Sequence, residues 1–249
     1  LLRVEHYYDE GFLEDISFTL RRGEIVGFAG LAGAGRTELM QSLCGLTGKA
    51  AGKVYFNGEE MVCRNYMEAM EKGIVYVSED RGKYGLIVDL SVEQNISLPQ
   101  IDKLAGGLKR LDVKREEELG KKYIEEVNIK APDGRFLVAN LSGGNQQKVS
   151  VSKALALKPS IVILDEPTRG VDVNAKAEIH KIISGLPRQG LTVIMVSSEL
   201  PDLLGMCDRI YVMKDGRIAS CLDRDEATQE SILNIALEGV KEKRGGLRQ

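Results

Sequence analysis

Alternation of apolar and polar positions predicts short β-strands in the first and last thirds of the chain. Residues 16–20 (Ile-Ser-Phe-Thr-Leu) repeat with period two, which is typical of a strand with one buried face. Residues 25–29 (Ile-Val-Gly-Phe-Ala) form a continuous apolar run, as expected for a strand that is buried on both faces. Further strand-like runs follow at 54–58, 73–77, 161–164, 191–196 and 210–213.

Apolar residues recur at helical spacing between several of these runs. Helices are expected over 38–46, 112–127 and 175–186, and the second of them has a charged side opposite an apolar stripe. The pattern from about 91 to 158 is helical throughout. The expected stripe of the second helix consists of Val113, Leu119, Tyr123, Ile124 and Val127.

This layout predicts an α/β fold. We expect a core over residues 1–90 and 159–235, interrupted by a helical subdomain over 91–158. The segment Lys241–Gln249 is basic and contains glycine, so residues 236–249 are expected to form a flexible basic tail.

Composition narrows the class of protein only a little. The chain has 249 residues, of which 43% are hydrophobic and 29% charged, as in an ordinary globular domain. The net charge of −3 gives no sign of broad affinity for nucleic acid. Four separated cysteines without a CxxC pair indicate reduced thiols in a cytosolic protein. No apolar run reaches the ~18 residues of a membrane span, and the first residue is Leu, which suggests a piece of a longer polypeptide.

A glycine-rich loop at 30–37 follows one predicted strand and precedes a predicted helix. Its sequence, Gly-Leu-Ala-Gly-Ala-Gly-Arg-Thr, lets backbone N–H groups curl around phosphate oxygens at the positive end of a helix. Thr37 offers a hydroxyl to Mg²⁺, whereas Arg36 stands where such loops carry the slimmer lysine. A simple glycine turn is the alternative interpretation. The candidate phosphate-binding residues are Gly30, Leu31, Ala32, Gly33, Ala34, Gly35, Arg36, Thr37 and Glu38.

Two acids end the apolar run at 161–164. Asp165 can hold Mg²⁺ through water, and Glu166 can polarise an attacking water. General-base work of this kind is typically worth ~10²–10⁴ in rate. A strand capped by two solvated acids is the alternative.

A second glycine turn, Leu141–Lys148 (Leu-Ser-Gly-Gly-Asn-Gln-Gln-Lys), opens a predicted helix near Asn145. The hydroxyl of Ser142 and the N–H groups of Gly143 and Gly144 can meet a γ-phosphate at the positive helix end. An ordinary N-cap is the alternative.

Nearly the whole chain resembles the ATP-binding subunit of bacterial sugar ABC importers. More narrowly, it is similar to the second nucleotide-binding half of the tandem ribose, galactose, arabinose or xylose type. The segments that carry this resemblance are 30–39 (GLAGAGRTEL), 74–81 (IVYVSEDR), 141–148, 161–173 (IVILDEPTRGVDV) and 194–200 (IMVSSEL).

The resemblance implies a P-loop NTPase fold with a RecA-like core, an ABC-type antiparallel β subdomain and an inserted helical subdomain. It implies ATP and Mg²⁺ as ligands and a location in the cytoplasm, peripheral on the inner face of the cell membrane. The implied partners are an N-terminal nucleotide-binding half or a second copy, membrane permease subunits and, indirectly, a periplasmic sugar-binding protein. No nucleic-acid partner is expected.

The resemblance also assigns roles to individual residues. Thr37, Glu79 and Asp165 would hold Mg²⁺, and Glu166 would be the catalytic base. The signature turn Ser142–Gly144, together with Gln146, would contact an ATP held mainly by the partner. Asp172 would lie in a loop that bridges the two protomers. Tyr7 is the first candidate to stack on adenine, with Tyr8 and Phe12 as alternatives.

Three positions depart from the family pattern. Arg36 replaces lysine, Ser198 stands where most members have a histidine that contacts the γ-phosphate, and Glu79 stands where most have glutamine. A carboxylate can still bind Mg²⁺. We therefore expect a weak ATP site at the chain's own phosphate loop and an intact signature that is donated to the partner's site.

Three other classes of protein share part of this pattern. A non-hydrolysing, nucleotide-binding regulatory half-domain fits the three departures. A DNA-maintenance ATPase of the SMC or Rad50 kind would need a very long coiled coil between loop and signature, where this chain has only residues 38–140. A GTPase would need an Asn-Lys-x-Asp motif, which this sequence lacks.

Overall fold

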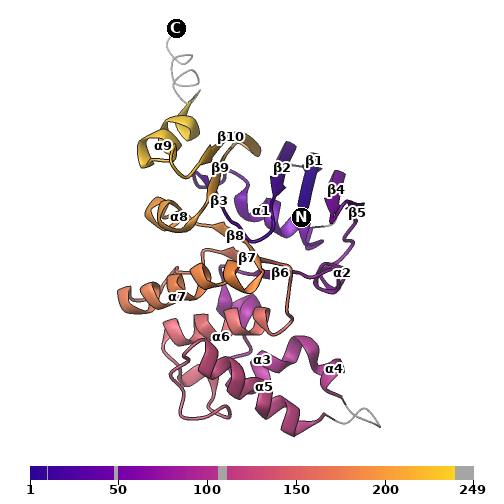
Figure 1. Ribbon diagram of the computed structural model, residues 1–249, viewed down its shortest axis with the longest axis vertical. Helices are drawn as coiled ribbons and strands as arrows, with labels where there is room; N and C mark the ends of the chain where they lie inside the picture. The colour runs from indigo at the N-terminus through magenta and orange to yellow at the C-terminus, as the bar shows by residue number, and fades with distance from the viewer. Residues whose placement is uncertain (10, 48–49, 106–110, 239–249) are drawn as a thin grey trace. The chain divides into compact units, whose positions relative to one another are not determined.

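The computed structural model describes residues 1–9, 11–47, 50–105 and 111–238, shown in Figure 1. Contacts divide the chain into two compact units, Leu1–Ala69 with Thr192–Gln249, and Met70–Leu191. We call them unit 1 and unit 2 and describe each by itself. The boundaries of the helical subdomain expected at 91 and 158 stay a prediction.

Unit 1 contains a four-stranded antiparallel sheet of order β2-β1-β4-β5. Its strands are β1 (Leu2–Asp9), β2 (Leu13–Leu20), β4 (Ala50–Phe56) and β5 (Glu59–Glu60). Alternate residues of β2 are buried near its end, as its period-two pattern predicts. Val4 pairs with both Phe18 and Val54, so β1 lies in the middle of the sheet.

A second set of strands in unit 1 has the order β10-β9-β3-β8. It consists of β3 (Ile25–Gly30), β8 (Thr192–Val196), β9 (Arg209–Lys214) and β10 (Arg217–Asp223). The apolar strand β3 runs parallel to both β8 and β9, and its residues up to Ala29 are buried. A strand covered on both faces must be apolar throughout, which explains its continuous hydrophobic run.

Helices α1 (Arg36–Leu43), α8 (Leu200–Met206) and α9 (Gln229–Leu237) complete unit 1, and α2 (Tyr66–Glu71) lies at its boundary. Helices α8 and α9 lie beside β3 and β9 (Figure 1). A Cβ atom at Gly27 would lie 2.8 Å from Cys207 Sγ, so glycine permits this close packing. The expected tail at 236–249 begins inside α9, and residues 239–249 lie outside the described part.

A buried ion pair joins Glu24, the residue before β3, to Arg209 at the start of β9. Arg209 Nη2 lies 2.7 Å from Glu24 Oε1, and Arg209 Nε lies 3.2 Å from Glu24 Oε2. Arg209 Nη2 also donates to the carbonyl of Thr19 at 3.0 Å. The bond to Glu24 raises the pKa of Arg209, which therefore stays charged inside the unit.

Unit 2 holds the parallel strands β6 (Ile74–Val77) and β7 (Ile161–Asp165), with Tyr76 in register with Ile163. Its described helices are α3 (Val92–Ser97), α4 (Ile101–Leu104), α5 (Val113–Glu126), α6 (Gly143–Leu155) and α7 (Val173–Gly185). Short helical turns are η1 (Arg81–Gly85), η2 (Leu98–Gln100), η4 (Val138–Asn140) and η5 (Pro187–Gln189).

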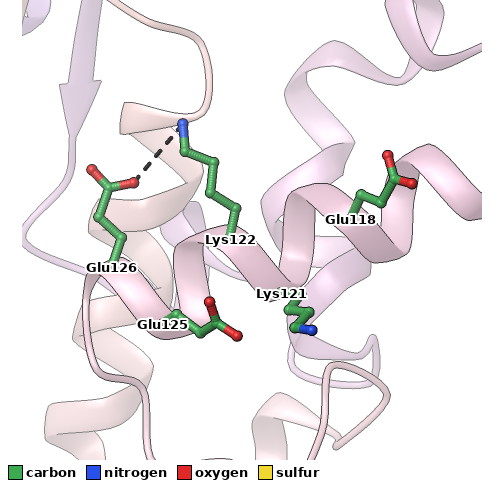
Figure 2. A pocket seen from close by; sticks show the side chains of 5 residues that line it. All are labelled: Glu118, Lys121, Lys122, Glu125 and Glu126. Carbon is green, nitrogen blue, oxygen red and sulfur yellow. Dashed lines mark ion pairs between the residues drawn. The ribbon is translucent and has the colours of Figure 1, made fainter.

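Helix α5 shows where the expected apolar stripe holds. Tyr123 and Val127 are buried as predicted, whereas Val113 in the first turn is exposed. Gly120 extends the buried face, because a Cβ atom there would lie 2.5 Å from Glu93 Cβ on α3. The opposite side of α5 lines a shallow hollow with charged residues only, including a Lys122–Glu126 ion pair at 3.9 Å (Figure 2). This face is a solvated helix surface.

Among the helices that the structure describes, none combines the length and the apolar character needed to cross a membrane.

The Glu24–Arg209 pair generates a stability prediction. Glu24→Gln leaves a buried guanidinium without its carboxylate, and we expect it to lower the free energy of unfolding by about 3–5 kcal/mol in urea titrations. Glu14→Gln is the matched control, because Glu14 pairs with Arg217 at an exposed site, where ion pairs contribute little. Equal effects of the two substitutions would contradict the buried role of Glu24.

Candidate functional site

The glycine-rich loop lies in unit 1 between β3 and α1. A Cβ atom at Gly30 would lie 2.5 Å from the carbonyl oxygen of Met213, so only glycine fits there. Gly35 is the N-cap of α1 with φ of 94°, a conformation that favours glycine. A glycine cap has no side chain to bind the first amides of α1, and a helix N-terminus of this kind can bind an anion. Leu31, Ala32 and Gly33 are exposed, whereas Ala34 is buried.

Arg36 is engaged by the backbone at the end of β8. Its Nη1 donates to the carbonyl of Ser197 at 2.8 Å. Ser198, the next residue, is exposed. Arg36 and Ser198 are two of the three residues that depart from the family pattern. Because Arg36 bonds the carbonyl of the residue before Ser198, the two lie near each other within unit 1. Thr37 and Glu38 in the first turn of α1 are partly exposed.

The candidate aromatic residues differ in accessibility. Tyr7 is 5% exposed, and its hydroxyl lies 2.9 Å from Ser42 Oγ on α1. Burial raises the pKa of Tyr7 to about 12. Phe12 is 61% exposed, and its carbonyl oxygen would lie 3.5 Å from a Cβ atom at Gly35. The Phe12 side chain is thus solvent-exposed on a segment beside the phosphate loop, whereas the Tyr7 side chain is buried.

The two acids lie at the end of β7 in unit 2. Asp165 is fully buried, and its Oδ2 accepts a hydrogen bond from the hydroxyl of Tyr76 at 2.7 Å. Glu166 has φ of 47°, which is the left-handed region. For a residue other than glycine this conformation costs of order 1–3 kcal/mol and occurs often at functional sites. Glu166 is half-buried.

Glu79 follows β6 and forms an ion pair with Arg169 in the turn after β7. The side chain of Glu79 is 34% exposed. Arg81 Nη1 donates to the carbonyl of the same Arg169 at 3.1 Å. Both arginines lie within sequence motifs, but these contacts were not predicted, because the partners lie about 90 residues apart along the chain.

The signature turn starts helix α6. Ser142 is its N-cap in extended conformation, is exposed, and makes no side-chain cap bond; its Oγ instead accepts from Asn145 Nδ2 at 3.0 Å. Gly143 is half-buried, and Gly144 is buried where a Cβ atom would collide with that of Ala175 on α7. The first amides of α6 are therefore left without a side-chain cap, next to an accessible hydroxyl.

Two further predicted residues have structural partners. Gln146 Nε2 donates to the carbonyl of Val138 at 3.1 Å. Asp172 is exposed and caps α7, since its Oδ1 accepts from the amide of Ala175 at 3.0 Å. Capping by aspartate is typical of helix N-termini. A role of either residue at a neighbouring protomer stays a prediction.

Lys148, the last residue of the signature octet, is a buried lysine that sequence reasoning did not assign. Its Nζ donates to the carbonyl of Asn128 at 2.7 Å and to Glu178 Oε2 at 2.5 Å. These bonds join α6 to α7 and to the end of α5. The bond from Lys148 lowers the pKa of Glu178.

No cluster of three or more His, Cys, Asp or Glu side chains suited to a metal ion occurs among residues 1–238 outside the gaps at 10, 48–49 and 106–110. Thr37 and Asp165 belong to different units. Their hydroxyl and carboxylate oxygens are nevertheless the kind of ligand that Mg²⁺ prefers.

Solved structures share this fold. The ATP-binding cassette MJ0796, in a dimer bound to ADP and Pi, matches with a TM-score of 0.76 at 22% identity over 90% of this chain and 99% of that one. The ADP conformation of the cassette MJ1267 matches with a TM-score of 0.76 at 22% identity over 99% and 98% of the two chains. The fold is that of an ATP-binding cassette, as expected from the sequence.

Sequence comparison gives the family. A model of the ABC transporter family matches residues 13–169, and the chain belongs to this family. Ribose import ATP-binding protein RbsA of Caldanaerobacter subterraneus subsp. tengcongensis is 44% identical over 239 residues, 96% of this chain and 48% of that protein. RbsA of Clostridium perfringens (strain SM101) is 48% identical over 236 residues, 95% and 47% of the two chains. The chain spans about half the length of these curated relatives.

The Lys148–Glu178 pair generates a prediction on pH. Because the folded pKa of Glu178 is lowered, its contribution to stability is present above its unfolded pKa of about 4.3 and is lost as pH falls through the folded value. Glu178→Gln should therefore lower the melting temperature at pH 7 by about 2–4 °C, with a smaller difference below about pH 4. Calorimetry over this range measures both effects.

Glu118→Gln on the solvated face of α5 is the matched control, since no buried lysine depends on it. A difference between Glu178→Gln and the unsubstituted chain that persists unchanged below pH 4 would contradict the assignment.

Proposed function

We propose that this chain is the ATP-binding half of a bacterial sugar importer, with a weakened nucleotide site of its own and an intact signature that it donates to its partner. The observation that carries the proposal is a contrast between two helix N-termini. At α6, Ser142 is exposed and the first amides lack a side-chain cap. At α1, the guanidinium of Arg36 is bonded to the carbonyl of Ser197.

The chain's own phosphate loop binds the triphosphate of ATP mainly through backbone amides. Gly33 and Gly35 both have positive φ, which turns successive N–H groups toward one concave surface. Arg36 contributes less than a lysine would, because its planar guanidinium is held by Ser197 and is too broad to slide between terminal phosphates.

The acidic groups of the reaction are Asp165 and Glu166. Mg²⁺, when bound, would be held by the Thr37 hydroxyl and the Asp165 carboxylate and would neutralise phosphate charge. Tyr76 fixes the orientation of Asp165 by its hydrogen bond. Glu166 accepts a proton from the attacking water. Glu79 can bind Mg²⁺ only after its ion pair with Arg169 breaks, and the cost of breaking this pair lowers its affinity for the metal ion.

The donated face consists of Ser142, Gly143 and Gly144. These groups contact ATP only when two nucleotide-binding halves close on each other, so ATP favours the closed state by the affinity that they add. Loss of the γ-phosphate removes those contacts and permits opening. The partner is an N-terminal nucleotide-binding half or a second copy of this chain.

Support for sugar import comes from the relatives rather than from any single residue. The two relatives described above are named for ribose import. We infer that the chain works in the cytoplasm, against membrane permease subunits that receive sugar from a periplasmic binding protein. By the family resemblance, we infer that the choice of sugar lies with those partners.

The second candidate function is a regulatory half that binds nucleotide without hydrolysing it. The observations that favour it are the Arg36–Ser197 bond and the Glu79–Arg169 ion pair, which occupy two groups of the expected ATP site. Single-turnover hydrolysis of ATP, measured with and without the partner half, separates the two functions.

Arg36→Lys tests the weakened site. The slimmer lysine can reach the terminal phosphates, so we expect tighter binding of Mg-ATP and faster turnover, each by about tenfold or more, the size of a hydrogen bond to a charged group. Isothermal titration and a phosphate-release assay measure the two quantities. Turnover of many per second by the unsubstituted chain, abolished by Arg36→Ala, would contradict the proposal.

Phe12→Ala tests the base platform. Stacking of a base on an aromatic ring is worth about 1–3 kcal/mol, so the Kd for ATP should rise about fivefold or more. The matched control is Tyr7→Phe, which removes only the buried hydroxyl bonded to Ser42 and should leave the Kd unchanged. An unchanged Kd in Phe12→Ala would contradict the role of Phe12.

A further inference from the structure

We propose that Arg81 is a positioning residue that holds the signature turn in its phosphate-binding conformation before nucleotide arrives. The proposal rests on the donation of Ser142–Gly144 to a partner's ATP, and it gives Arg81 a role at the signature turn. All of its groups lie in unit 2.

The guanidinium of Arg81 fills the space that a side chain at residue 143 would take. Arg81 Nη2 lies 3.0 Å from the position of a Cβ atom on Gly143, and the carbonyl oxygen of Gly170 lies 3.4 Å from the same position. Arg81 Nη1 donates to the carbonyl of Arg169 at 3.1 Å. One planar group thus touches the signature turn and the loop after β7 together.

The ion pair between Glu79 and Arg169 closes this arrangement. Glu79 lies two residues before Arg81 on the segment that follows β6, and its carboxylate binds the side chain of Arg169. The backbone and the side chain of Arg169 are therefore both held by the same short segment. Three loops that are far apart in sequence are joined at one place.

The backbone of Arg81 is itself fixed. It opens the turn η1, in which the Asp80 carboxylate accepts from the amide of Lys83 at 3.0 Å and the carbonyl of Arg81 accepts from the amide of Leu86 at 2.8 Å. The far end of the turn is fastened to α6, because Lys153 Nζ donates to the carbonyl of Gly85 at 2.9 Å. The turn η1 therefore contacts α6 at both of its ends, through the guanidinium of Arg81 beside Gly143 and through the carbonyl of Gly85 bonded to Lys153.

The stability of α6 does not explain this placement. A cation beside a helix N-terminus is unfavourable, because it faces the positive end of the macrodipole. The guanidinium of Arg81 nevertheless lies against Gly143, the first residue of a 13-residue helix. Arg81 instead restricts the conformation of the turn. Gly143 has no side chain to restrict its own backbone. The planar guanidinium beside Gly143 therefore lowers the conformational entropy that is lost when the turn binds a phosphate.

The first test is amide hydrogen exchange of the nucleotide-free chain by NMR. In Arg81→Ala the amides of residues 143–146 should exchange about tenfold faster, because the guanidinium that lies against Gly143 and bonds the carbonyl of Arg169 is lost, and a hydrogen bond from a charged donor is worth about this much. Amides of the phosphate loop, 30–38, and of the buried strand β7 should be unchanged. Unchanged exchange at 143–146 would overturn the proposal.

Two variants guard against trivial effects. Lys83→Ala alters the same turn at an exposed side chain that lies over the Tyr84 ring, 4.9 Å from its centroid, and should leave residues 143–146 unchanged. Arg81→Lys keeps the charge but loses the planar fork, so exchange should still increase. If Arg81→Ala fails to fold, Arg81→Lys decides the matter by the same measurement.

The second test is ATP turnover by the partner half assembled with this chain. Arg81→Ala should lower kcat about tenfold while KM stays within about twofold, because it disturbs a contact made only on closure. Ser142→Ala should give the same split. A loss with Ser142→Ala but none with Arg81→Ala overturns the role of Arg81. No loss with Ser142→Ala overturns the donation of the signature, and hydrogen exchange then decides on Arg81 alone.

Discussion

The close packing of α6 against α7 is the constraint on which the candidate site depends. Gly144 has no room for a Cβ atom beside Ala175, and one turn further along, the buried Lys148 joins α6 to Glu178 of α7. These contacts fix the axis of α6, and hence the direction in which its first amides point. Ser142 is exposed at the N-terminus of this rigid helix. A group that is to contact a ligand bound by another protomer needs such an exposed and fixed position.

The two glycine turns of the chain use the same physics with different neighbours. Each opens a helix whose first amides have no side-chain cap, so each can bind an anion. They differ in the arginine beside them. Arg36 donates to a carbonyl at the end of β8, whereas the guanidinium of Arg81 lies against Gly143 in the signature turn. We propose that the first arrangement weakens a phosphate site and that the second orders one.

The sequence predicted much of this molecule because local chemistry carried the signal. Apolar periodicity located the strands β2, β3, β7, β8 and β9, and the change to helical spacing located α5 and α6. The requirement for glycine at Gly30 and Gly35 follows from a close approach and a positive φ, both of which leave a trace in sequence. Val113 was predicted to be buried and is exposed, because periodicity does not tell where a packed face ends.

Sequence by itself therefore determined the class of fold, the family and the positions of the two glycine turns that open α1 and α6, since each depends on residues that are close together along the chain. The tertiary structure alone decided which partners the charged side chains have. Arg36 meets Ser197 across 161 positions, and Glu79 meets Arg169 across the two strand ends of unit 2. Burial of Tyr7 and exposure of Phe12 were likewise decided by packing. A side chain's partner depends on which distant backbone the fold brings near, and no local pattern records it.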